Sequence, residues 1–377
     1  MTSNKREKGL IVIQLTGGND GLNTVVPYGR GEYYDSRSTV HIPQDKVLPL
    51  NGEIGFNPSM APMKALWDEG KVAVLQGIGY ENPNRSHFRS MDIWHTAEPD
   101  AIGTEGWLGR AVREIDPQGE NVLTAVNFGR GLPRALGCPG VSVASVGDLE
   151  TYGLFPDIED EELRMFTLEA FSRMYGNVAG RDPVMSLLSK TGQDAYVGAD
   201  ILRTAPEQYS SNVEYRSDSL SKNVRSIAQV FLANLGTKVY YTQHGSFDTH
   251  SGELPTHAQL WDDVAGSVGS LMDDLKEHGR EDDAAVLIFS EFGRRIKDNG
   301  TGSDHGSGGV AFLIGGAVNG GLYGDYPSLH EAEQINGDLR PNNDFRSTYA
   351  AILDKWMGLD PDPIVNGQFE QFDLFRN

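Results

Sequence analysis

Cysteine is nearly absent from this sequence, which contains a single one, Cys138, in 377 residues. One thiol cannot form an intramolecular disulfide or a cysteine-rich metal cluster, so a metal site would need other ligands. Long apolar runs are missing as well, since no stretch reaches the roughly 18–20 residues that a membrane-spanning helix needs. We therefore expect no integral membrane segment.

A signal peptide is not recognisable at the start of the chain, where the charged leader MTSNKREK runs directly into an apolar stretch. A signal would need its own apolar region and small residues at a cleavage site. We expect a periplasmic or secreted protein if a signal has been removed, and a cytoplasmic protein otherwise.

Positive charge is scarce. The chain has 32 lysines and arginines against 53 aspartates and glutamates, which gives a formal net charge of −21. A nucleic-acid surface needs a basic stripe to neutralise phosphates, and none is visible, so we expect no nucleic-acid partner. The hydrophobic content of 38% and charged content of 23% are those of a soluble globular protein.

Two familiar catalytic motifs are missing. A Gly-x-Ser-x-Gly elbow does not occur, which argues against an esterase of the α/β-hydrolase type. The segment TGGND at residues 16–20 resembles the start of a phosphate-binding loop, but it lacks the Gly-Lys-Ser/Thr ending. Binding of a nucleoside triphosphate is therefore not expected.

Apolar strands alternate with amphipathic helices along most of the chain. The pattern predicts strands at residues 9–15, 71–79, 237–243, 284–290 and 309–316, with weaker ones at 121–129 and 141–146. It predicts helices at residues 60–69, 221–236, 258–279 and 343–358. This alternation indicates an α/β fold with a parallel or mixed sheet covered on both faces. We expect one domain over 1–377, with residues 157–200 as a helical insertion or lid.

Polar residues follow several of these strands. Asp20 follows the first strand, Asp248 and His250 follow the strand at 237–243, and Glu291 follows the strand at 284–290. Asp304 and His305 lie in the glycine-rich loop after Glu291. Ligands of open α/β sheets bind at the carboxyl ends of strands, so these residues are candidate metal ligands. Each also has an ordinary explanation, because an Asp after a strand is usually a turn residue.

A candidate nucleophile lies in the segment NPNRSHF, where Ser86 precedes a predicted helix. Free N–H groups at a helix start favour an anionic ester, and Arg85 and His87 could bind an oxyanion. Ser86 could equally be an N-cap residue, and His87 could pack structurally.

The motifs GGNDGLNTVVPY, NRSHF, FDTHSGELPTHAQL, SEFGR, DHGSGGVAFLIGG and DFRSTYAAIL together resemble a bacterial family known as domain of unknown function fifteen-oh-one. Its members often begin with a twin-arginine signal. More broadly, the chain resembles the alkaline phosphatase superfamily, which includes sulfatases. The resemblance spans residues 9–360. It implies an alkaline-phosphatase-like three-layer α/β/α sandwich with a mostly parallel central sheet.

The superfamily resemblance also implies roles for individual residues. Asp20, or its neighbour Asn19, would bind metal, and Ser86 would be the nucleophile. Further metal ligands would be Asp248 with His250 or His257, then Glu291, and finally His305. The implied cofactor is one or two divalent ions of zinc, manganese or magnesium, and the implied substrate is a small anionic ester or an anionic glycan.

One position departs from the superfamily pattern, because Phe292 occupies the place of a ligand histidine. Either Asp304 substitutes for it, or only one metal binds, or the site has decayed. The motif that matures to formylglycine in sulfatases is absent from the chain. The resemblance therefore implies a metal-dependent hydrolase of phosphate esters, with sulfate esters as the second choice. The alternatives are a catalytically decayed binding or assembly protein and a sugar-phosphate transferase or mutase.

Overall fold

A computed structural model describes residues 6–152, 162–163, 166–167, 169–170, 173 and 183–376. Within these residues a nine-stranded sheet has the strand order β13-β5-β12-β9-β1-β8-β6-β7, and β14 pairs with β5. The strands of this sheet are β1 (Gly9–Leu15), β5 (Val72–Gly79), β6 (Ala125–Phe128), β7 (Ala144–Val146), β8 (Val239–His244), β9 (Ala284–Ser290), β12 (Gly309–Ile314), β13 (Gly321–Tyr323) and β14 (Asn343–Asp344).

The sheet is mostly parallel, as predicted. Strand β1 lies between β8 and β9 and runs parallel to both, with Leu10 opposite Val239 and Ala285. Its sequence GLIVIQL is buried at every position, which is typical of a central strand covered on both faces. Only β12 runs antiparallel to its neighbours β9 and β5 among the described strands of this sheet.

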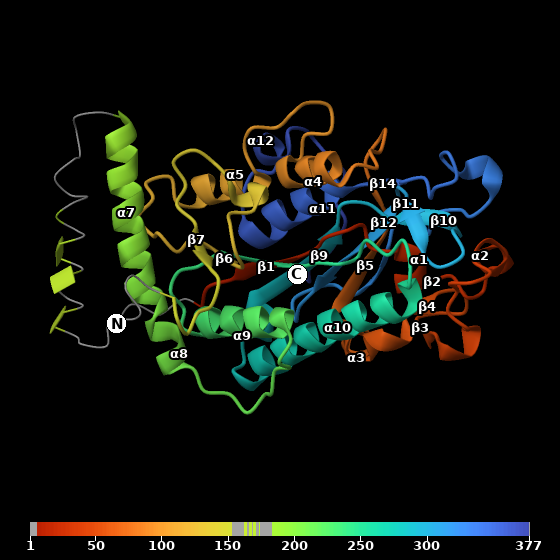
Figure 1. Cartoon of the computed structure of the whole chain (residues 1–377), viewed down its shortest axis with the longest axis horizontal. Helices are drawn as coiled ribbons and strands as arrows, with labels where there is room; N and C mark the ends of the chain where they lie inside the picture. The colour runs from red at the N-terminus through yellow and green to blue at the C-terminus, as the bar shows by residue number, and fades with distance from the viewer. Residues whose placement is uncertain are drawn as a thin grey trace.

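Helices cover both faces of the sheet (Figure 1). Alternate residues of β1 enter two different cores, with Ile11 and Ile13 on one face and Leu10 and Val12 on the other. The first face packs against α3 (Ala61–Asp68), α9 (Ser219–Leu232) and α10 (Glu253–Glu277). The second packs against α4 (His87–Thr96), α5 (Trp107–Ile115), α11 (Phe345–Ala351), a π-helical turn (Ile352–Met357) and α12 (Asp362–Val365). The predicted three-layer α/β/α class is thus confirmed.

Smaller elements surround the loop after β1. They are the short helices α1 (Gly21–Thr24) and α2 (Gly31–Ser36) and a three-stranded sheet of β2 (Val25–Val26), β3 (Leu48–Pro49) and β4 (Gly55–Phe56). Two differences from the predicted elements lie near the same edge. The glycine-rich loop between β9 and β12 contains a hairpin of β10 (Arg294–Asp298) and β11 (Ser303–His305). Helix α10 begins at Glu253 rather than at residue 258.

The early start of α10 is compatible with the proline in this segment. Pro255 lies in the first helical turn, where its missing N–H has no intrahelical partner to lose. As a result His257 belongs to the helix and its side chain is buried in the interior. Helix α11 (Phe345–Ala351) begins after Asp344, whose side chain caps it by accepting a hydrogen bond from the Arg346 N–H.

The predicted insertion at 157–200 lies partly outside the described residues. From residue 183 onward the described part of this segment belongs to α7 (Pro183–Leu202), which is followed by α8 (Thr204–Gln208). Helix α7 lies beyond β7, at the opposite end of the molecule from the β10–β11 hairpin (Figure 1). This part of the segment therefore does not form a lid over that hairpin. None of the helices in the described ranges combines the length and apolar character needed to cross a membrane.

Candidate metal centre

Four polar loops meet at one edge of the sheet, where the parallel strands β1, β5, β8 and β9 end. His87 begins helix α4 after β5, and Asp248 follows β8. Glu291 directly follows β9, and His305 ends the hairpin that leads into β12. Strand β12 runs in the opposite direction and therefore begins at this edge. The predicted convergence at the carboxyl ends of the strands is thus present in the fold.

The innermost residues of this edge are His87, Asp248 and His305. One ligand atom from each of the three lies within 4.8 Å of the others, so the group could hold a metal ion. The two Nε2 atoms of His87 and His305 are 3.0 Å apart. His305 Nε2 is 3.1 Å from Asp248 Oδ1, and His87 Nε2 is 3.5 Å from Asp248 Oδ2.

His250 extends the group toward solvent. Its Nε2 atom lies 3.0 Å from His305 Nε2 and 3.0 Å from Asp248 Oδ1. Its Nδ1 atom lies 3.0 Å from Asp304 Oδ1. The side chains of His250 and Asp304 are 45% and 53% exposed, so this part of the group is open to ligands. Asp304 lies behind His250, and in the described part of the chain its side chain forms no hydrogen bond or ion pair with the side chains of the inner three residues.

The opposite ring nitrogens of the inner histidines are held by acceptors. His305 Nδ1 is 2.9 Å from the Arg85 carbonyl oxygen, and His87 Nδ1 is 2.9 Å from Glu291 Oε1. Burial would raise the pKa of Glu291, but hydrogen bonds from His87, the Gly17 N–H and Ser290 hold it below its usual value. An ionised carboxylate and a carbonyl can only accept, so each Nδ1 carries the proton.

A cation fits this arrangement of protons. When each ring carries its single proton on Nδ1, the Nε2 atoms of His87 and His305 present lone pairs to each other and to the Asp248 carboxylate. Acceptors at these distances repel unless a proton or a metal ion lies among them. Histidine nitrogens oriented by a carboxylate or carbonyl behind them are the usual arrangement in metal sites. Imidazole and carboxylate donors without sulfur suit zinc or manganese better than magnesium.

Arg294 holds the loops of the centre together. Its side chain is buried and donates to the carbonyl oxygens of Gly17, Gly18, Phe247 and Ser303. It also donates to Asp248 Oδ1 at 2.6 Å. Burial would raise the pKa of Asp248, but Arg294 outweighs this effect and lowers it. The donors of Arg294 are thus engaged by groups of the centre and its loops.

Phe292 closes one side of the centre. Its ring centroid is 5.0 Å from that of His87 and 5.1 Å from that of His305, and the side chain is buried. A Cβ atom on Gly18 would lie 2.2 Å from the Phe292 ring, so the loop after β1 also packs directly against it. The phenyl ring occupies space beside the histidines and offers no ligand atom.

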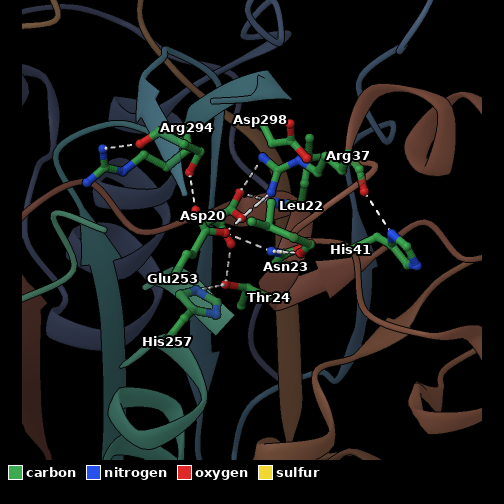
Figure 2. Close-up of polar contacts among 12 residues, drawn as sticks. Asp20, Leu22, Asn23, Thr24, Arg37, His41, Glu253, His257, Arg294 and Asp298 are labelled. Atoms are coloured by element: carbon green, nitrogen blue, oxygen red, sulfur yellow. Dashed lines mark hydrogen bonds and ion pairs between the residues drawn. The ribbon is translucent and has the colours of Figure 1, made fainter. Parts of the chain in front are cut away.

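Asp20 lies in a separate cluster, shown in Figure 2. Both Asp20 oxygens contact the buried Arg37 guanidinium, with Nη2 at 2.9 Å from Oδ1. The Asp20 carboxylate also accepts from the Leu22 N–H as the cap of α1. Burial would raise the pKa of Asp20, but Arg37 outweighs it and lowers the pKa to about 2. Since its oxygens are taken by these donors, we leave Asp20 out of the candidate metal centre.

The remaining residues around Asp20 are also engaged. The neighbouring residue Asn19 accepts hydrogen bonds from Trp261 and Thr24 through its side-chain oxygen. Glu253 accepts from Asn23 at 2.7 Å and from Ser303 at 2.5 Å. Burial and repulsion from Asp20 raise the pKa of Glu253. This cluster ties α1, α2 and α10 to the β10–β11 hairpin.

Ser86 and Arg85 lie at the rim of the centre. Ser86 is the N-cap residue of α4, but its hydroxyl makes no capping hydrogen bond and the side chain is exposed. The Arg85 guanidinium donates to Asp338 at 2.8 Å, so it does not face the histidines. Arg85 contributes to the centre through its carbonyl oxygen instead.

A pocket of about 450 Å³ opens beside the centre and includes His87, Asp248 and Glu291 in its wall. One side is a single face of α4, where the spacing 88, 91, 92 and 95 brings Phe88, Met91, Asp92 and His95 together. The other side consists of Gln14, Thr16 and Gly17 at the end of β1, with Arg134 at the margin.

The sequence model of the family described as Protein of unknown function (DUF1501) matches residues 168–368, more than half of the chain. The chain belongs to this family. The family resemblance inferred from the motifs is thereby confirmed. A search of the curated proteins found no match.

Several solved structures are similar to this DUF1501 protein. The PsFucS1 sulfatase from Pseudoalteromonas sp. is 14% identical with a TM-score of 0.44, and the match covers 98% of this chain and 71% of that chain. An alkaline phosphatase superfamily protein from Vibrio parahaemolyticus is 11% identical with a TM-score of 0.43, covering 96% and 69%. The phosphonate monoester hydrolase of Agrobacterium radiobacter is 11% identical with a TM-score of 0.42, covering 97% and 79%. Similarities this distant carry no conclusion about activity.

Sequence reasoning missed three features of the site. It treated His87 as an oxyanion-binding or structural residue, whereas the structure places its Nε2 in the inner group. It did not single out Gln14 or His95, which line the pocket. The helical spacing of residues 88, 91, 92 and 95 was a usable signal for one pocket wall. The supporting role of Arg294 could not be read from the sequence, because its partners are Asp248 and backbone atoms that lie far apart along the chain.

Proposed function

We propose that this DUF1501 protein is a metal-dependent hydrolase of phosphate monoesters, with sulfate monoesters as the second choice. The observation that supports this most is the convergence of the Nε2 atoms of His87 and His305 on the Asp248 carboxylate. These residues would hold the ion, with His250 as a fourth candidate ligand. A bound divalent ion would neutralise charge on the ester oxygens and lower the pKa of an attacking hydroxyl.

Ser86 is the proposed nucleophile. It immediately precedes the candidate ligand His87, and its exposed hydroxyl is not used as a helix cap. The first N–H groups of α4 would favour the negative charge of a bound phosphoryl group at the same place. In this scheme Ser86 forms a covalent phosphoryl intermediate as the alcohol leaves, and water then releases phosphate.

Glu291, Arg294 and the Arg85 carbonyl are proposed to position the ligands. Glu291 and the carbonyl fix which nitrogen of His87 and His305 carries the proton, and Arg294 keeps the Asp248 carboxylate ionised and oriented. Removing a partner of this kind usually lowers metal affinity by roughly 10–100-fold.

The test compares Ser86→Ala with His305→Ala on 4-nitrophenyl phosphate and 4-nitrophenyl sulfate, with zinc or manganese added. Ser86→Ala should lower kcat by on the order of 10³-fold or more while bound metal remains stoichiometric. His305→Ala should lose both activity and metal. His330→Ala is the matched control, because His330 is exposed and pairs with Glu32 outside the centre. Full activity in both test variants would refute the proposal.

A second candidate function is that of a binding or assembly protein with a decayed hydrolase site. The specific observation in its favour is Phe292, whose ring packs against His87 and His305. Elemental analysis of the purified protein after metal repletion distinguishes the hydrolase from the binding or assembly protein. One tightly held ion per chain supports the hydrolase, and none supports the binding protein.

A further inference from the structure

The pocket beside the candidate metal centre contains a polar pair that the proposed chemistry does not use. Gln14 and His95 are 2% and 6% exposed, so both are more than nine-tenths buried, yet both line the pocket. A glutamine is unexpected in β1, where the other residues are apolar or glycine. A buried polar side chain at a pocket wall is costly unless it is hydrogen-bonded.

The carbonyl oxygen of Gln14 is held from behind. Gln14 Oε1 accepts a hydrogen bond from the Tyr241 hydroxyl and lies 2.7 Å from His95 Nε2. Tyr241 is on the neighbouring strand β8, buried under the pocket. Since Oε1 is an acceptor, His95 Nε2 carries the proton and donates it. Burial lowers the pKa of His95 to about 4, in agreement with a neutral ring.

The free ends of both side chains remain available. Gln14 Nε2 and His95 Nδ1 have no hydrogen-bond partner in the described part of the chain. Neither atom is completely enclosed by the surrounding protein. The pocket that these two residues line is the accessible space beside them. Toward the pocket, Gln14 presents an N–H donor and His95 presents a lone-pair acceptor. A hydroxyl group can pair with both, because it accepts one hydrogen bond and donates another.

The rest of the pocket favours an uncharged, ring-sized group. Arg134 does not add free positive charge, because its Nε is 2.8 Å from Asp92. Met91 lies farther along the same helix face, and Phe88 at the rim is 92% exposed, which is unusual for an aromatic side chain. A hydroxylated ring could place its carbon face against Phe88 and its hydroxyl edge against Gln14 and His95.

We propose that Gln14 and His95 recognise a hydroxyl group on the alcohol part of the ester, so that the substrate is an ester of a sugar or another polyol. This inference rests on the proposed hydrolase function and narrows its substrate class. Tyr241 acts as a positioning residue, because it holds the Gln14 amide without reaching the pocket itself. A pocket of about 450 Å³ is large enough for one such ring next to the centre.

The experiment uses the full chain loaded with zinc or manganese and two matched esters. Glucose 6-phosphate carries ring hydroxyls, whereas cyclohexylmethyl phosphate has a similar ring and ester but none. Wild type should prefer glucose 6-phosphate. Gln14→Met keeps the side-chain length and removes the donor, and it should lower the ratio of the two kcat/KM values about tenfold or more. Gln243→Met is the control, since Gln243 pairs with Gln14 in register but is exposed outside the pocket.

A second variant and a binding readout keep the two proposals distinguishable. Tyr241→Phe should lower the same ratio by a smaller factor, and it serves if Gln14→Met does not fold. Saturation-transfer NMR with free glucose should show binding to wild type that Gln14→Met weakens. Active enzyme with an unchanged ratio in both variants would overturn the hydroxyl subsite alone. Glucose binding that depends on Gln14, with no hydrolysis of either ester, would instead overturn the hydrolase proposal and leave the subsite standing.

Discussion

Two clusters centred on an aspartate lie near the same edge of the sheet, and they differ in what surrounds the carboxylate. Asp248 is 44% exposed and faces three histidine Nε2 atoms whose lone pairs point toward it. Asp20 is fully buried and faces the Arg37 guanidinium, which already satisfies its oxygens with N–H donors. The first cluster has acceptors in excess and room for a ligand. The second is internally neutralised and has neither.

The comparison shows why an Asp after a strand is weak evidence for a metal site by itself. Both residues follow parallel strands and precede short turns, so their local sequence signals are alike. What separates them is the partner that the tertiary fold supplies. An arginine at the C-terminal end of α2 makes Asp20 structural. Asp248 is a candidate ligand because His250 of its own loop and His87 and His305 of two other loops face it.

The largest effect is expected from Arg37→Met. Removing the guanidinium leaves the carboxylates of the Asp20 cluster buried without their cation, which should cost about 3–5 kcal/mol of unfolding free energy. Urea unfolding followed by circular dichroism measures the loss. Lys64→Met, which breaks the partly exposed pair with Asp68, is the control and should cost no more than about 0.5 kcal/mol. Equal losses in the two variants would contradict the structural role of the Asp20 cluster.

Much of the fold could be predicted from the sequence, because buried parallel strands such as GLIVIQL and AAVLIFS have a distinctive apolar pattern. The order of strands and polar loops in the sequence also predicted the edge of the sheet at which the site lies. Individual roles did not follow. Arg37 and Asp20 are 17 residues apart, and Arg294 binds backbone atoms, so neither pairing leaves a local pattern. The capping state of Ser86 also depends on a side-chain rotation that the sequence does not specify.

The next largest effect is expected from Glu291→Gln. The amide removes the negative charge behind His87, so His87 should become a weaker ligand and metal affinity should fall by roughly 10–100-fold. Competition with a chromophoric chelator measures this affinity. Glu281→Gln is the control: Glu281 lies before β9 and pairs with Lys71, away from the centre. An unchanged affinity in Glu291→Gln would show that the charge of Glu291 does not support His87 as a ligand.

A smaller effect is expected from Asp304→Asn, which tests whether His250 belongs to the centre. Asparagine can still accept from His250 Nδ1, though without charge, so metal affinity should fall by about tenfold. Asp298→Asn is matched to it, because Asp298 lies in the same hairpin and accepts hydrogen bonds from Thr39 instead. If both variants bind metal as wild type does, the centre consists of His87, Asp248 and His305 alone.

The smallest effect is expected from Glu253→Gln, and it concerns pH. An unfolded chain releases the proton of Glu253 above the ordinary glutamate pKa of about 4.3. In the native protein the pKa of Glu253 is raised, so the carboxyl group is still protonated at that pH. The native state then binds more protons than the unfolded state, so this residue makes stability fall as pH rises from about 5 toward 8. Glutamine resembles the protonated acid in shape and keeps a donor for Asp20. The difference in unfolding free energy between pH 5 and pH 8 should therefore be smaller in Glu253→Gln than in wild type or in the exposed control Glu53→Gln. An equal difference in all three proteins would show that Glu253 is ionised in the native state, and the Asp20 cluster would then hold two charged carboxylates against one arginine.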